Sequence, residues 1–155
     1  MEVQIKDNKI YAPLKDKWLV VKPEEKVRQR YICRLVDSYG YDINQMDQEL
    51  KVTNSHRGQG SARADIVIWK SAQDKTDSKS AFIVVECKAE SVTIRKEDYY
   101  QGYNYAAWAG ADFFVTTNLK ETRIFKVVKG ELPKKLEEIV DIPTAEMANN
   151  EKKVK

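Results

Sequence analysis

The stretch Ala81-Phe-Ile-Val-Val-Glu-Cys-Lys88 decides the fold class of this chain. Its apolar run from Phe82 to Val85 is nearly continuous, which is typical of a strand covered on both faces at the centre of an α/β sheet. Side chains alternate faces along a strand, so Glu86 and Lys88 should point to one face and Cys87 to the other. The charged residues therefore stand at the carboxyl end of a buried strand, where α/β sheets place their sites.

The segments around this strand predict further strands and two long helices. Pro23 followed by two glutamates is a helix start, because proline suits the first turn and acids complement the positive end of the helix dipole. Gly40 and Gly110 stand where left-handed helix ends are expected. We expect helices at 23–39 and 97–109 and strands at 49–53, 63–69, 81–88, 111–117 and 123–128, separated by polar turns at 54–62, 71–80 and 118–122.

The ends of the chain are less regular. Residues 1–22 should form one or two short strands or an irregular cover, residues 132–140 a short helix beginning at Pro133, and residues 148–155 a frayed polar tail. The order of helix, three strands, helix and two strands predicts an α/β fold with a mixed sheet flanked by helices.

Length and composition favour one soluble domain. The chain has 155 residues, 42% of them hydrophobic and 33% charged, and a mean hydropathy of -0.62. We expect a core at about 23–128, an N-terminal cover at 1–22 and a tail at 141–155. No apolar run approaches the roughly 20 residues of a spanning helix, and the N-terminus lacks the apolar segment of a signal peptide.

The cysteines and the net charge bear on compartment and partner. Cys33 and Cys87 lie in apolar runs without metal-ligand spacing, so buried free thiols and a cytoplasmic location are expected. The formal net charge of +3 permits a polyanionic partner without demanding one.

Asp65, Glu86 and Lys88 form the informative group of charged residues. If Asp65 lies on the strand next to Glu86, the two carboxylates repel each other unless a cation neutralises them. Mg²⁺ is the natural candidate, since it prefers hard oxygen ligands and completes its shell with water and phosphate oxygens. Lys88 can then orient the attacking water or stabilise the charge of the transition state. These parts suit hydrolysis of a phosphodiester.

This arrangement resembles the PD-(D/E)xK nuclease superfamily, and more of the chain is similar to the N-terminal nuclease domain of type I restriction enzyme R subunits. The resemblance covers roughly residues 23–128 and implies a restriction-endonuclease-like fold. It rests on Pro23-Glu-Glu25-Lys-Val-Arg28-Gln29, Arg63-Ala-Asp65-Ile-Val-Ile, Val84-Val-Glu86-Cys-Lys88-Ala, Gln101-Gly-Tyr-Asn-Tyr105 and Phe114-Val-Thr-Thr-Asn118.

The resemblance implies roles residue by residue. Asp65 and Glu86 would bind Mg²⁺ or Mn²⁺ with help from the backbone carbonyl of Cys87, and Lys88 would be the catalytic lysine. Glu25 would be the helix carboxylate that touches the metal or its waters. Gln101 and Tyr105 would engage DNA or steady the site, and their spacing of four places both on one helix face.

Other interpretations of these motifs stay open. A Glu-x-Lys pair alone is also typical of a solvated ion pair on a strand. The loop 55–63 can embrace a phosphate backbone through Arg57 and Arg63, or it can be a plain turn. His56, the only histidine, lies in that loop and is expected at the surface.

The resemblance makes a Mg²⁺-dependent DNA endonuclease of a restriction or other defence system the leading hypothesis. Ala64 replaces the proline of the superfamily pattern, and no Gly-x-x-x-x-Gly-Lys-Ser/Thr phosphate loop occurs, so we expect no ATP-driven motor in this chain. The first alternative is a DNA-binding or assembly module that does not cleave, and the second is a protein-interaction domain. The expected partners are DNA and other restriction subunits, with no membrane. Cutting both strands would be easiest for a homodimer.

Overall fold

A six-stranded sheet forms the centre of the computed structural model, which describes residues 1–52, 62–128 and 135–154. The strands lie in sequence order: β4 (Met46–Val52), β5 (Ala62–Ile68), β6 (Ile83–Cys87), β7 (Phe113–Thr117), β8 (Thr122–Lys126) and β9 (Glu137–Ile139). Strands β6 and β7 are parallel, and the other neighbours are antiparallel. The mixed α/β fold expected from the order of the elements is confirmed.

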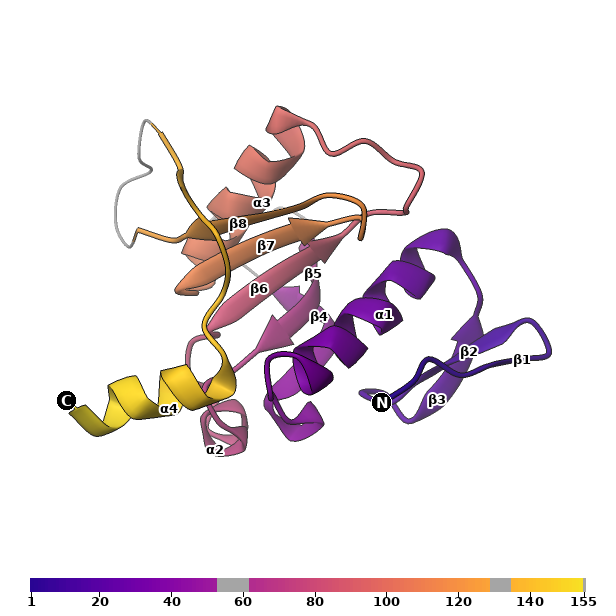
Figure 1. Cartoon of the computed structure of the whole chain (residues 1–155), viewed down its shortest axis with the longest axis horizontal. Helices are drawn as coiled ribbons and strands as arrows, with labels where there is room; N and C mark the ends of the chain where they lie inside the picture. The colour runs from indigo at the N-terminus through magenta and orange to yellow at the C-terminus, as the bar shows by residue number, and fades with distance from the viewer. Residues whose placement is uncertain (53–61, 129–134, 155) are drawn as a thin grey trace.

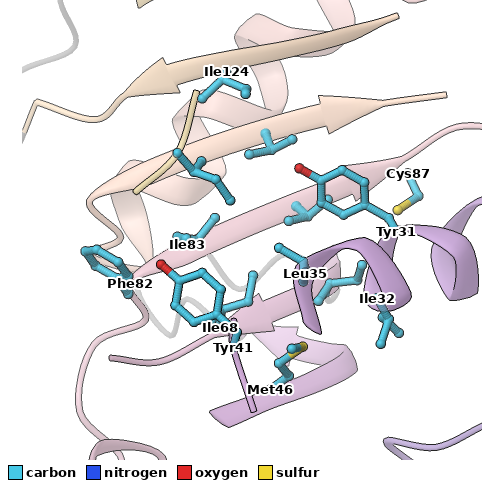
Figure 2. Close-up of a cluster of buried hydrophobic side chains, with 14 of the residues drawn as sticks. Tyr31, Ile32, Leu35, Tyr41, Met46, Ile68, Phe82, Ile83, Cys87 and Ile124 are labelled. Atoms are coloured by element: carbon cyan, nitrogen blue, oxygen red, sulfur yellow. The ribbon is translucent and has the colours of Figure 1, made fainter. Parts of the chain in front are cut away.

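Helices α1 (Pro23–Asp37) and α3 (Lys96–Trp108) pack on the two faces of this sheet. Figure 1 shows α1 crossing one face, with α3 behind the sheet. On the α1 side, Tyr31, Ile32 and Leu35 pack against side chains from β5 and β6 such as Ile68 and Ile83 (Figure 2). On the α3 side, the core contains Tyr103, Ala106, Ala64, Val67, Val84, Phe114 and Phe125. Strand β6 is therefore covered on both faces, as its apolar run predicts.

The predicted helix ends are found close to their expected places. Gly40 has a φ of 76° and its N–H donates to the carbonyl of Val36 at 3.1 Å, which closes the end of α1. Gly110 has a φ of 75° and plays the same part after α3. Both glycines adopt the left-handed conformation, which a residue with a Cβ takes only at a cost.

The N-terminal segment forms a second, three-stranded antiparallel sheet. It consists of β1 (Ile5–Lys6), β2 (Lys9–Ala12) and β3 (Lys17–Val20), where one or two strands were expected. Ile10 and Ala12 on one face of β2 are buried. This small sheet lies beside α1, at the end of the molecule away from α4 (Ala145–Val154) (Figure 1).

The helix predicted for 132–140 is wrong in the part that the structure describes, because Glu137–Ile139 form β9 on the edge of the sheet. Residues three apart share a face of a helix, but here Leu136 packs on the α3 side and Ile139 on the α1 side, as in a strand. Residues 129–134, including Pro133, lie outside the described residues.

The prediction of a frayed tail is also wrong, because α4 occupies most of it. The Thr144 hydroxyl accepts a hydrogen bond from the Met147 N–H at 3.2 Å, and Ala148 is buried. Ala145 and Ala148 give α4 a small apolar face, which the otherwise polar composition of this segment did not indicate.

Two short helices were not expected, η1 (Ile43–Gln45) and α2 (Ala72–Thr76), the latter inside the predicted turn 71–80. Cys87 is buried as expected, but Cys33 is only partly buried, and both are free thiols. Among the described residues, no helix has the length and apolar character that a membrane crossing needs.

Candidate active site

The carboxyl end of β6 carries the predicted pair of charges. The Lys88 Nζ lies 2.9 Å from the Glu86 Oε1, so the two side chains meet on one face of the strand. Cys87, between them, points to the other face and packs in the core beneath α1. The alternation expected from the sequence therefore places Glu86 on the side of α3.

Asp65 reaches the same end of the sheet from the neighbouring antiparallel strand. Regular pairing of β5 with β6 includes Ile66 opposite Val85, one residue short of Asp65. The Asp65 Oδ2 then accepts a hydrogen bond from the Cys87 N–H at 2.7 Å. A side-chain carboxylate thus continues the ladder where the backbone pairing stops, which fixes Asp65 next to the end of β6.

A cavity of about 320 Å³ joins these residues to α3. Asp65 and Glu86 line it together with Gln101 and Tyr105, the pair expected on one face of the helix. Its remaining walls are Glu24, Gly102, Ala64, Val84, Val85 and Phe114. The cavity is therefore lined by carboxylates, an amide and apolar side chains, and its Glu86 carboxylate pairs with Lys88.

The two glutamates at the start of α1 lie in different surroundings. Glu24 lines the cavity, whereas Glu25 is buried and accepts hydrogen bonds from Arg28 Nη1 at 2.9 Å and from Gln29 Nε2 at 2.8 Å. Successive residues on a helix are rotated by about 100°, so only one of two adjacent glutamates can face the cavity. Sequence reasoning singled out Glu25 and missed Glu24, although Pro23-Glu-Glu contains both.

Arg28 gathers the carboxylates on the α1 side. Besides Glu25, its guanidinium donates to Glu49 Oε1 at 2.9 Å and to Asp65 Oδ1 at 3.1 Å. We call Arg28 and these three acids the Arg28 cluster. Arg28 and Glu49 were not identified as site residues from the sequence, since no spacing along the chain connects them.

Burial shifts the protonation of the cavity carboxyls. Desolvation raises the pKa of Asp65, although the Cys87 N–H and Arg28 oppose it, and desolvation likewise raises the pKa of Glu86 against the effect of Lys88. The pKa of Glu24 is raised by burial and by the charge of Asp65. Burial alone would lower the pKa of Lys88, but its hydrogen bond to Glu86 and the surrounding acids raise it, so the lysine stays charged.

The residues present fit a hard divalent cation. The raised pKa values of Asp65, Glu86 and Glu24 mean that their negative charges are incompletely compensated by the protein, and a cation would relieve that cost. Over the described part of the chain, no three Asp, Glu, His or Cys side chains converge tightly enough to enclose an ion by themselves. Mg²⁺ needs only one or two carboxylates when water and substrate complete its shell.

Two predicted DNA contacts, Arg57 and Arg63, are not placed by the structure. Arg57 lies outside the described residues, as does His56, which was expected at the surface. The side chain of Arg63 is not described either, although the Arg63 backbone in β5 pairs with Lys51 of β4. Cys87 supplies its N–H to Asp65, and the part of its carbonyl as a metal ligand stays a prediction.

Comparison with known proteins agrees with this architecture. A family model described as type I restriction enzyme R protein N terminus (HSDR_N) matches residues 23–143, so the match begins at α1 and leaves β1–β3 outside it. No curated protein matches the sequence. The fold is shared with a solved fragment described as an HsdR subunit of a type I restriction enzyme from Vibrio vulnificus YJ016, at 20% identity and a TM-score of 0.57. That similarity covers 82% of this chain and 24% of the other chain.

Proposed function

Because this chain belongs to the family of type I restriction enzyme R protein N-terminal domains, we propose that it is a Mg²⁺- or Mn²⁺-dependent DNA endonuclease of a restriction system. One observation carries the proposal. Asp65 of β5 and Glu86 of β6 line a cavity of about 320 Å³ at the carboxyl end of β6, and Lys88, just after β6, pairs with Glu86.

The proposed roles follow from the positions of the groups. Asp65 and Glu86 hold the cation through carboxylate oxygens, with the carbonyl of Cys87 as a further ligand. When bound, the cation supplies charge neutralisation for the phosphate under attack. Lys88 orients the attacking water and donates to a phosphate oxygen, while its ion pair with Glu86 keeps it charged.

The surrounding residues complete the proposed site. Glu24, which lines the cavity, is better placed than Glu25 to touch water near the cation, and Glu25 supports Asp65 through Arg28. Gln101 and Tyr105 face the cavity from α3 and contact the DNA strand there. Arg57 and Arg63 are proposed to contact the phosphate backbone of the DNA. Other restriction subunits are proposed partners, a homodimer would allow both strands to be cut, and the reaction is expected in the cytoplasm.

A second candidate function is a DNA-binding or assembly module that does not cleave. Asp65 already pairs with Arg28 and Glu86 with Lys88, and this is the observation that favours it. Protein cations that partly neutralise the two carboxylates reduce the demand for a metal, so the two functions differ in whether a divalent cation binds.

The deciding experiment is cleavage of supercoiled plasmid and of single-stranded DNA with Mg²⁺, Mn²⁺ or EDTA. We expect metal-dependent cutting by the wild type and a loss of at least about 100-fold in Glu86→Ala, because a ligand of the cation is removed. Glu90→Ala, which removes an exposed glutamate outside the cavity, is the matched control and should cut normally. Circular dichroism checks folding of both variants.

Undiminished cutting by a folded Glu86→Ala would overturn the proposed site. No cutting by the wild type, together with salt-sensitive DNA binding, would support the non-cleaving module.

A further inference from the structure

Arg28 joins carboxylates from three elements of the fold, and one of them is Asp65. Its side chain is 7% exposed, and its planar guanidinium contacts Glu25 of α1, Glu49 of β4 and Asp65 of β5. A guanidinium offers donors in a rigid fork, so the carboxylates that it joins are held in fixed relative positions. The orientation of Asp65 therefore depends on what holds Arg28.

Glu49 has an unusual backbone at the point opposite Asp65. Its φ is 53°, in the left-handed region that a residue with a side chain rarely adopts, although it lies within a strand. The β4–β5 ladder pairs Gln48 with Ile66 and Leu50 with Ala64, but skips the two described residues between them, Glu49 and Asp65. The distortion is thus centred on the pair formed by these two acids.

At this distortion, the side chains of both strands switch from one face of the sheet to the other. Gln48 lies on the α1 side, where it accepts a hydrogen bond from Gln29, but Leu50 packs in the core beneath α3. Ile66 and Ala64 on β5 show the same switch between the two cores. Residues two apart share a face in a regular strand, so both strands change face at this level.

The switch explains how one carboxylate can serve both sides of the sheet. Asp65 contacts Arg28 on the α1 side, accepts a hydrogen bond from the N–H of Cys87 at the carboxyl end of β6, and lines the cavity on the α3 side. Strand irregularities of this kind re-aim side chains next to functional sites. Glu49 supplies the irregular backbone and, at the same time, one of the anions that hold Arg28.

We propose that Glu49 is a positioning residue, which acts through Arg28 to present Asp65 to a divalent cation in the cavity. This inference rests on the proposed function, in which Asp65 is a ligand of that cation. Without the Glu49 carboxylate, Arg28 is shared between Glu25 and Asp65 alone. It then draws more strongly on Asp65, whose oxygens bind a cation less well.

Mn²⁺ binding to the full chain, measured by isothermal titration calorimetry, tests the proposal. Glu49→Gln should weaken Mn²⁺ binding on the order of 10-fold, the usual effect of removing a group that orients a metal ligand. Asp47→Asn is the matched control, since Asp47 lies on the same strand but pairs with Lys15, and should change the affinity by less than about twofold. Asp65→Asn should abolish binding.

Cleavage at different metal concentrations separates positioning from a structural defect. Saturating Mn²⁺ should restore cutting by Glu49→Gln, because all the ligands are present, but should not restore cutting by Asp65→Asn. Glu49→Gly accepts the left-handed backbone without strain, so it should stay folded and still bind Mn²⁺ weakly.

The outcomes distinguish the two proposals. If the wild type binds no Mn²⁺, the proposed function fails and the role of Glu49 falls with it. If the wild type binds Mn²⁺ and Glu49→Gln binds it as well as Asp47→Asn does, the role of Glu49 alone is overturned.

Discussion

The Arg28 cluster and the Glu86–Lys88 pair lie near the carboxyl end of β6 and differ in how deeply their side chains are buried. In the Arg28 cluster, the side chains of Arg28 and Glu25 are only 7% and 9% exposed, whereas Glu49 is 41% exposed and the buried Arg28 Nε has no hydrogen-bond partner among the described residues. In the pair on the α3 side, Lys88 and Glu86 are 29% and 28% exposed, and Glu86 lines the cavity. The first group holds the fold in one arrangement, whereas the second keeps capacity for a ligand.

Substitutions in the Arg28 cluster should therefore affect mainly stability, and substitutions in the Glu86–Lys88 pair mainly function. A buried ion pair costs much to break, because removing one partner leaves the other charge without water or counter-ion. Breaking a half-exposed ion pair costs little, because water replaces the lost partner. Asp65 belongs to both groups, since it bonds to Arg28 and also lines the cavity.

The largest effect is expected from Arg28→Leu. Three carboxylates from three elements would lose their buried cation, so the free energy of unfolding should fall by about 3–5 kcal/mol. Urea unfolding measures it, with Arg30→Leu as the control because Arg30 lies exposed on the same helix. A loss below about 1 kcal/mol would remove the distinction between the two groups.

Gly102→Ala tests how closely α3 approaches Glu86 of the Glu86–Lys88 pair. A Cβ on Gly102 would lie 2.5 Å from the Glu86 Oε2 and nearer still to the ring of Phe114. We expect a loss of about 1–3 kcal/mol from overpacking, although alanine favours a helix over glycine by about 1 kcal/mol.

Asn104→Ala, at an exposed position of the same helix, is the control for helix propensity and should not destabilise the chain. Replacing Phe114 by leucine in the Gly102→Ala background should recover part of the loss in a thermal unfolding scan. A stabilised Gly102→Ala would contradict the close approach of α3 to Glu86.

The smallest effect is expected from Glu86→Gln and depends on pH. Burial raises the pKa of Glu86 in the folded chain, so protonation favours the folded state and this contribution is lost as the pH rises through the folded pKa. At pH 7 the ionised carboxylate therefore costs stability, and Glu86→Gln should raise the free energy of unfolding by up to about 1 kcal/mol. The gain should shrink as the pH falls through the raised folded pKa of Glu86, where the wild type protonates.

Glu25→Gln gives the matched contrast, since Glu25 pairs with a buried guanidinium. It should lower the free energy of unfolding at pH 7. A change of the same sign in both variants, measured by urea unfolding, would show that the two groups are equally well satisfied by the protein.

The amino-acid sequence alone determined those features that depend on neighbours along the chain. The start of α1 at Pro23, its end near Gly40, the buried run of β6 and the shared face of Glu86 and Lys88 all follow from local periodicity and capping. The family resemblance rests on the same short segments. Periodicity repeats every two or every 3.6 residues, so a short stretch is enough to reveal it.

Tertiary structure alone decided which side chains meet across elements. It placed Glu24 rather than Glu25 at the cavity, paired Glu49 with Arg28 and brought Gly102 onto Glu86. It also made a strand of Glu137–Ile139, where a helix was predicted, because these residues pair with β8. These contacts join residues distant in sequence, and their energies depend on strand twist, helix rotation and burial, which no local pattern contains.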